Sequence, residues 1–130
     1  MTNFLARRKP AVGTPEFGKS FEHYILMELL AYKAYRSAEL EISFWRTSNK
    51  QEVDFILDDM QVAIEVKATA RAHEGDLRGF GILAEEAKIG KRLLVSLDTS
   101  ARRVSDRAGA IDILPWRSFL EQLWNGDIVR

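Results

Sequence analysis

Two carboxylates and a lysine occur close together in the segment QEVDFILDDMQVAIEVKA, residues 51–68. Asp54 precedes Glu65 by eleven residues, and Lys67 follows Glu65 by two. Glu65 and Lys67 belong to an otherwise aliphatic run, VAIEVKA, in which charged side chains are rarely buried without a partner. These residue types and spacings suggest a polar site built into an apolar sheet.

Strand geometry predicts how these side chains meet. Successive side chains of a strand point to opposite faces, so Glu65 and Lys67 share a face. If the chain turns at residues 59–60, Asp54 lies directly opposite Glu65, and Glu52 lies opposite Lys67. Directly opposed Cβ atoms are about 4.5–5.5 Å apart. Asp-Met is not a favoured hairpin turn, so this register depends on the assumed turn.

Such a patch has the composition of a metal-dependent hydrolytic site. Two carboxylates in a half-buried site repel each other, and the pKa of one rises unless a cation joins them. Mg²⁺ (or Mn²⁺) is commonly held by one or two carboxylates together with water and phosphate oxygens. The ammonium group of Lys67 could hold a phosphate or a water molecule. The alternative is a cross-strand ion pair of Lys67 with Glu52 or Glu65 on a solvated face.

A long helix predicted over residues 14–36 adds a third carboxylate. Its apolar residues include Ile25, Leu26, Leu29 and Leu30, which recur with helical spacing. Glu22 lies three, four and seven residues before Ile25, Leu26 and Leu29, so we expect it to continue the stripe that faces the core. A glutamate at such a position needs a partner, and the carboxylate patch would supply one through a shared metal or water.

The hydrophobic pattern predicts an α/β fold with element order α-β-β-β-α-β followed by β-α. The three consecutive strands form an antiparallel meander, and the following helix makes a right-handed crossover to a parallel strand. We therefore expect a mixed central sheet flanked by helices, in one domain over residues 14–130 after an arm at residues 1–13. The predicted elements are the helix 14–36, strands 41–48, 51–58 and 62–68, helix 76–87, strand 91–97, a polar loop 99–109, strand 110–114 and a helix 115–124.

Composition excludes few classes of function. Among 130 residues there are 19 basic and 19 acidic side chains, so bulk positive charge does not predict binding to a polyanion. There is no cysteine, which excludes thiolate metal sites and thiolate nucleophiles. No apolar run approaches the roughly 20 residues that a membrane span needs, and the first residues lack the pattern of a signal peptide. We therefore expect a cytoplasmic protein without membrane association.

The words QEVDFIL and AIEVKA resemble the D…(D/E)-x-K signature of the PD-(D/E)XK nuclease superfamily. More narrowly, the chain resembles a nuclease-like domain found after AAA+ ATPase modules in bacteria and archaea. The segments that carry this resemblance are FGKSFEHYILMEL, FWRTSNKQEVDFIL, IEVKA and ILPWRSFLEQLW, which together cover most of residues 16–124. Val53 stands where the superfamily has a proline.

The resemblance implies a restriction-endonuclease-like core, α-β-β-β-α-β, that hydrolyses DNA (or RNA) phosphodiester bonds with Mg²⁺ or Mn²⁺. Asp54 and Glu65 would bind the metal, Lys67 would activate or orient the attacking water, and Glu22 would complete the site. Related domains often work as homodimers. The alternative is a non-catalytic module that binds nucleic acid or regulates an AAA+ ATPase partner, since many superfamily members bind without cutting.

A second motif points to nucleotide binding. GTPEFGKS, from Gly13 to Ser20, matches the phosphate-loop pattern G-x-x-x-x-G-K-[ST]. That mechanism needs a buried strand before the loop, whereas ARRKPAV is short and charged. Pro15 also lacks one of the N–H groups that would cradle a phosphate. The alternative interpretation is the start of a helix, with Gly18 placed where another element packs closely.

Overall fold

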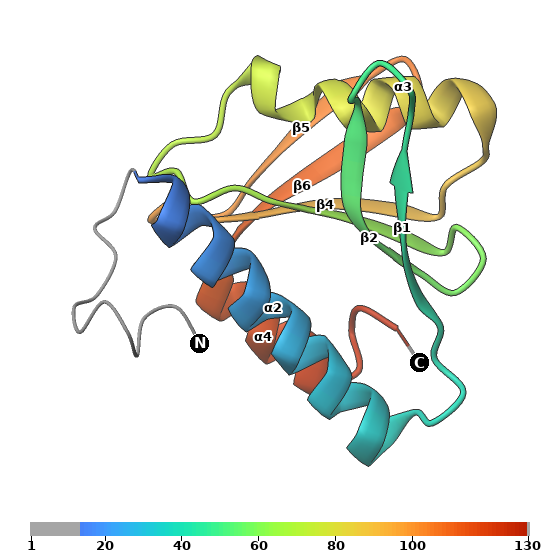
Figure 1. Cartoon of the computed structure of the whole chain (residues 1–130), viewed down its shortest axis with the longest axis vertical. Helices are drawn as coiled ribbons and strands as arrows, with labels where there is room; N and C mark the ends of the chain where they lie inside the picture. The colour runs from blue at the N-terminus through green and yellow to red at the C-terminus, as the bar shows by residue number, and fades with distance from the viewer. Residues whose placement is uncertain (1–13, 130) are drawn as a thin grey trace.

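The computed structural model describes residues 14–129, so the arm expected at residues 1–13 lies outside the described part. The helices and strands alternate along the chain largely as the pattern predicts (Figure 1). They are α2 (Pro15–Arg36), β1 (Ile42–Arg46), β2 (Glu52–Leu57), β3 (Val62–Val66), the 3₁₀ helix η1 (Glu74–Leu77), α3 (Arg78–Glu86), β4 (Lys91–Ser96), β5 (Arg102–Asp106), β6 (Gly109–Pro115) and α4 (Trp116–Trp124). This order confirms the predicted α-β-β-β-α-β core.

Local sequence explains where α2 begins. Thr14 has extended backbone angles, and its Oγ1 accepts a hydrogen bond from the Phe17 N–H at 3.2 Å. Pro15 occupies the first helical position, where its missing N–H removes no helical hydrogen bond. Glu16 in the first turn and Arg36 in the last turn both complement the helix dipole.

Six strands form one mixed sheet in the described part of the chain, in the order β1-β2-β3-β4-β6-β5. The β1-β2-β3 meander is antiparallel, and β4 pairs in parallel with both β3 and β6. The prediction of a polar loop over residues 99–109 was wrong. This segment contains β5, which pairs antiparallel with β6. β5 is an edge strand that is mostly exposed, so its sequence is polar and lacks the apolar pattern of an internal strand.

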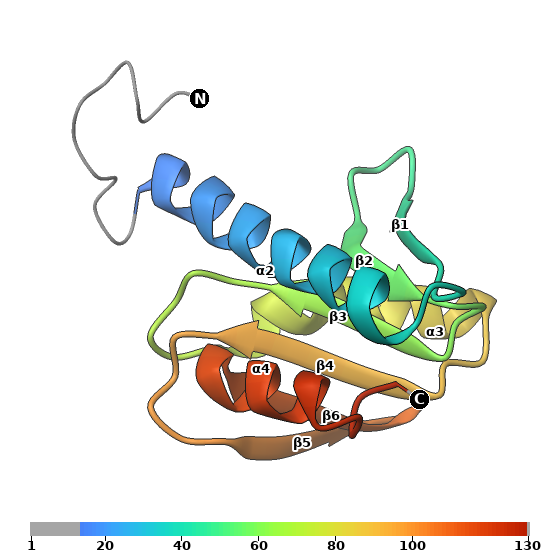
Figure 2. The same cartoon turned by 90° about the horizontal axis from the view of Figure 1, so that it is seen from below.

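Helices cover both faces of the sheet. α2 and α4 lie side by side on one face, and α3 lies on the other (Figures 1 and 2). Val104 is the residue of β5 that packs against the core on the α3 face. Since α3 follows β3 and leads into β4, the parallel β3–β4 pair has its crossover helix on that face.

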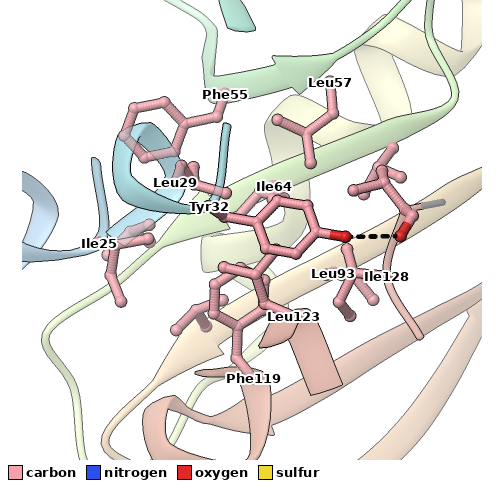
Figure 3. Close-up of a cluster of buried hydrophobic side chains, with 14 of the residues drawn as sticks. Ile25, Leu29, Tyr32, Phe55, Leu57, Ile64, Leu93, Phe119, Leu123 and Ile128 are labelled. Carbon is pink, nitrogen blue, oxygen red and sulfur yellow. Dashed lines mark hydrogen bonds between the residues drawn. The ribbon is translucent and has the colours of Figure 1, made fainter. Parts of the chain in front are cut away.

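The larger core lies between the sheet and the helices α2 and α4 (Figure 3). Ile25 and Leu29 are fully buried there, as predicted, and Leu26 packs against the cluster while partly buried. The prediction for Leu30 was wrong, since 42% of it is exposed. The Tyr32 hydroxyl donates a hydrogen bond to the Val129 carbonyl at 3.2 Å, which joins the helix to the end of the described chain (Figure 3).

No helix in residues 14–129 combines the length and apolar character needed to cross a membrane.

Candidate active site

Asp54 and Glu65 stand opposite each other on β2 and β3. The observed pairs Phe55–Ile64 and Leu57–Val62 have the register that the turn count predicted, and Asp54 and Glu65 are the residues that come next to the last of these pairs. The connection itself takes in residues 58–61 and is not a standard two-residue turn. Asp58 and Met60 adopt positive φ angles of 56° and 63° within it. The predicted register is therefore confirmed with a longer turn than expected.

The regular backbone pairing of the two strands ends at this point, and carboxylates take its place. The Asp54 N–H donates to Glu65 Oε1 at 3.1 Å, and the Val66 N–H donates to Asp54 Oδ2 at 2.8 Å. Each carboxylate is thus held by the backbone of the opposite strand. Carboxylates fixed in this way lose little conformational freedom when they bind a ligand.

A β-bulge sits directly at Asp54. On the other side of β2, Ser43 pairs with Ile56 but Trp45 pairs with Val53, so two residues of β2 stand opposite Phe44. Bulges bend a strand locally and re-aim its side chains, and they occur often beside active sites. The bulge therefore explains how Asp54 can turn its carboxylate toward β3.

Lys67 joins the pair from the residue that follows β3. Its Nζ lies 3.5 Å from Glu65 Oε2, and 40% of its side chain is exposed against 8% for Glu65. Its backbone N–H donates to the Val95 carbonyl at 2.9 Å, which fixes its position beside β4. The predicted grouping of Asp54, Glu65 and Lys67 is confirmed. Glu52 instead forms an ion pair with Arg46 at 3.1 Å.

Burial raises the pKa of both carboxyl groups. Burial, and next the negative charge of Asp54, raise the pKa of Glu65 to about 9. Burial also raises the pKa of Asp54, while a hydrogen bond between the two carboxyl groups opposes that rise. Burial alone would lower the pKa of Lys67, but Glu65 and Asp54 outweigh it and raise this pKa. At pH 7 the site therefore contains a protonated Glu65 beside an ammonium group.

The prediction that Glu22 faces the core was wrong. Phe21 and Ile25 are buried, whereas Glu22, about 100° from Phe21 around the helix, is exposed. Its carboxylate still interacts electrostatically with the site. Partial burial raises the pKa of Glu22, and the charges of Asp54 and Glu52 raise it further. The start of α2 and the loop after β3 lie at the same end of the molecule in both views (Figures 1 and 2).

The donor set fits a magnesium-like ion held by few protein ligands. Among residues 14–129, no three His, Cys, Asp or Glu side chains are grouped closely enough to hold a metal ion. Glu22 is therefore not part of a preformed ligand set. Asp54 and Glu65 supply carboxylate oxygens from a rigid sheet, and Mg²⁺ is commonly bound through one or two carboxylates. The proton on Glu65 has to leave before both carboxylates can act as ligands.

Sequence reasoning missed the residues that hold the loop after β3. Asp98 is buried, and its Oδ2 accepts hydrogen bonds from the Ala72 N–H at 3.1 Å and the Ser96 hydroxyl at 2.5 Å. The Leu97 N–H donates to the Thr69 carbonyl at 2.9 Å. The available signal was the pair Ser96 and Asp98 at the end of an apolar strand.

The phosphate-loop pattern does not form a loop in the described residues. Pro15 to Ser20 lie in the first turns of α2, and the Gly18 N–H donates to the Thr14 carbonyl at 3.1 Å as in a helix. Gly13 lies outside the described part. The expectation that something packs closely at Gly18 was wrong, because a Cβ there would meet no atom within 4 Å.

Comparison with known proteins places the chain in a family. No curated protein shows significant similarity to it. Residues 17–119, which include Glu22, Asp54, Glu65 and Lys67, match the family described as "Domain of unknown function (DUF4143)". Since this match covers most of the 130 residues, the chain belongs to the DUF4143 family.

Proposed function

We propose that this domain is a metal-dependent nuclease that hydrolyses DNA phosphodiester bonds. The observation that carries the proposal is the contact of Asp54, Glu65 and Lys67 at the point where regular β2–β3 pairing ends. Two carboxylates and an ammonium on adjacent strands also match the short signature of the PD-(D/E)XK superfamily. The α-β-β-β-α-β order of the described chain is the order expected of that superfamily.

Each residue has a distinct role in this proposal. Asp54 and Glu65 would hold Mg²⁺ or Mn²⁺, which when bound would polarise a phosphate oxygen and acidify a water molecule. Lys67 stays charged and half exposed, so its ammonium group can hold an oxygen of the scissile phosphate and orient the attacking water. Glu22, exposed beside the site, would accept a hydrogen bond from water on the α2 side.

The second candidate is a non-catalytic module of the same fold that binds nucleic acid or regulates an AAA+ ATPase partner. The absence of a three-ligand cluster in residues 14–129 favours this alternative. An AAA+ partner and a homodimer are parts of either proposal that follow from the resemblance. A cytoplasmic location is part of either proposal and follows from the composition.

The test is incubation of the chain with single-stranded and duplex DNA in Mg²⁺ and in Mn²⁺. We expect cutting by the unmodified chain and a loss of at least about 100-fold in Lys67→Ala and in Asp54→Asn. Asp54→Asn retains an oxygen to accept the Val66 N–H, so the strand contact can persist. Lys67→Ala should change the free energy of unfolding by at most about 1 kcal/mol, because its ion pair is partly exposed.

Matched controls lie elsewhere on the same sheet. Lys91→Ala removes an exposed lysine of β4, and Asp112→Asn changes a partly buried aspartate of β6 that pairs with Arg103. Both control variants should cut DNA like the unmodified chain. DNA binding without cutting in either metal would favour the non-catalytic module. Cutting that survives in Asp54→Asn would refute this site.

A further inference from the structure

We propose that a cavity on the α3 face is a second phosphate-binding site, which holds the DNA strand beside the reacting phosphodiester. This inference rests on the proposed function. The cavity has a volume of about 580 Å³ and lies between the η1–α3 segment and strands β5 and β6. Its charged lining residues are Arg71, Arg78, Arg102, Glu74 and Asp106.

The charges around this cavity favour an anion. Arg71 and Arg78 are exposed, and neither forms an ion pair within residues 14–129. Asp106 is already neutralised, since Arg92 contacts its two carboxylate oxygens at 2.6 and 2.8 Å. Glu74 is then the remaining acidic group of the lining. Arginine is the side chain best suited to phosphate, because its planar guanidinium can donate two parallel hydrogen bonds.

Arg102 is fixed in the cavity wall before any ligand arrives. Its Nη2 donates to the Ala72 carbonyl and lies 3.6 Å from Asp98 Oδ1. Its Nε is the one buried side-chain nitrogen or oxygen in the described residues that lacks a hydrogen-bond partner. A buried donor without a partner opposes folding, so this placement is poorly explained by stability alone. Buried polar groups that lack a hydrogen-bond partner are expected most often at functional sites.

One loop connects the cavity to the carboxylate site. Lys67 begins this loop, Arg71 lies four residues later, and the Ala72 N–H is held by Asp98. Four residues span at most about 14 Å. Successive phosphates of a DNA strand advance 3.4 Å along the helix axis, so the cavity lies within roughly four nucleotides of a phosphate at Lys67. Asp76 of η1 also lies near enough to influence Lys67 electrostatically.

The experiment measures DNA binding in EDTA, so that cutting cannot occur. Fluorescein-labelled 20-base-pair duplex is titrated by anisotropy at 50–200 mM salt with the unmodified chain and with the double variant Arg71→Gln/Arg78→Gln. Each lost phosphate contact should lower the salt-dependence slope by about 0.9. Over this fourfold change in salt, the unmodified chain should therefore lose about 12-fold more affinity than the variant.

The control is Arg36→Gln/Arg117→Gln, which removes the same charge from helices α2 and α4 on the opposite face. Those two arginines lie over Trp124 and Trp116, at 5.8 and 5.0 Å from the ring centres. The control should keep the slope of the unmodified chain. An equal slope change in both double variants, no change in either, or no DNA binding by the unmodified chain would each overturn the inference.

The two proposals fail in different ways. A slope change confined to Arg71→Gln/Arg78→Gln, without cutting in any metal, supports the phosphate site and refutes the nuclease activity. DNA cutting that depends on Asp54, with an unchanged slope in the Arg71→Gln/Arg78→Gln variant, supports the nuclease and refutes the phosphate site.

Discussion

Glu65 on β3 accepts a hydrogen bond from the backbone N–H of Asp54 on β2 at 3.1 Å, next to the last regular pair of the two strands, Phe55–Ile64. The two carboxyl groups also interact through a hydrogen bond that lowers the pKa of Asp54 and raises that of Glu65. The protonation of each carboxyl group therefore depends on the other, and Glu65 is the one that holds a proton up to about pH 9. The charge of the pair, its metal affinity and its contribution to stability all depend on that proton.

The metal-free protein should lose stability as pH rises from about 4.5 to about 9. Glu65 has its pKa raised from 4.5 to about 9, so in this window the folded state keeps a proton that the unfolded state has released. The free energy of unfolding then falls with increasing pH. Thermal melts in EDTA give the melting temperature at pH 6 and at pH 8.5. The fall in melting temperature between these two pH values should be smaller in Glu65→Gln than in the unmodified chain, by roughly 3–6 °C or more. Parallel drops in both proteins would contradict the assignment.

Metal binding should release a proton at neutral pH. Mg²⁺ or Mn²⁺ needs both carboxylates ionised, whereas Glu65 is protonated below about pH 9. Calorimetric titration at pH 7.5 in two buffers of different ionisation enthalpy should give about one proton released per ion, and the affinity for the metal should increase with pH.

Metal at 100 times its Kd should stabilise the fold by about 2.7 kcal/mol, and chelation of the metal should remove this stabilisation. The control variant Asp112→Asn should bind the metal ion like the unmodified chain. Unaltered metal binding by Asp54→Asn would exclude Asp54 and Glu65 as the metal site.

Two glycines of α3 should respond oppositely to alanine. A Cβ at Gly79 would collide with the backbone carbonyl of Glu52, so Gly79→Ala must displace α3 from β2. We expect a loss of about 1–3 kcal/mol in the free energy of unfolding, together with weaker metal binding at nearby Asp54. Gly81→Ala is the matched control: its Cβ would meet no atom within 4 Å, and alanine favours helix by about 0.5–1 kcal/mol. Denaturant unfolding measures the free energy of unfolding of both variants. Equal stability of the two variants would rule out a close approach of Gly79 to the Glu52 carbonyl.

ATP should not bind through the GTPEFGKS segment. Lys19 lies in the second turn of α2, where backbone N–H groups serve the helix and cannot surround a phosphate. Calorimetry with Mg-ATP should detect no binding to the unmodified chain or to Lys19→Ala. Micromolar affinity that disappears in Lys19→Ala would restore the nucleotide-binding interpretation.

Strand alternation and the position of the turn were sufficient to place Asp54, Glu65 and Lys67 together. These features depend on neighbours in the sequence, and the same holds for α2, whose start is set by Thr14 and Pro15. The order of the helices and strands other than β5 followed from the same short-range patterns.

The tertiary structure decided what depends on residues far apart in the chain. β5 has a polar sequence and exists because β6 offers it a partner at the sheet edge. Glu22 is exposed because the face of α2 that packs into the core carries Phe21 and Ile25. Helical spacing alone did not distinguish these positions. The proton on Glu65 and the cavity beside Arg102 arise from burial and charge contributed by several distant segments, so no single stretch of sequence encodes either one.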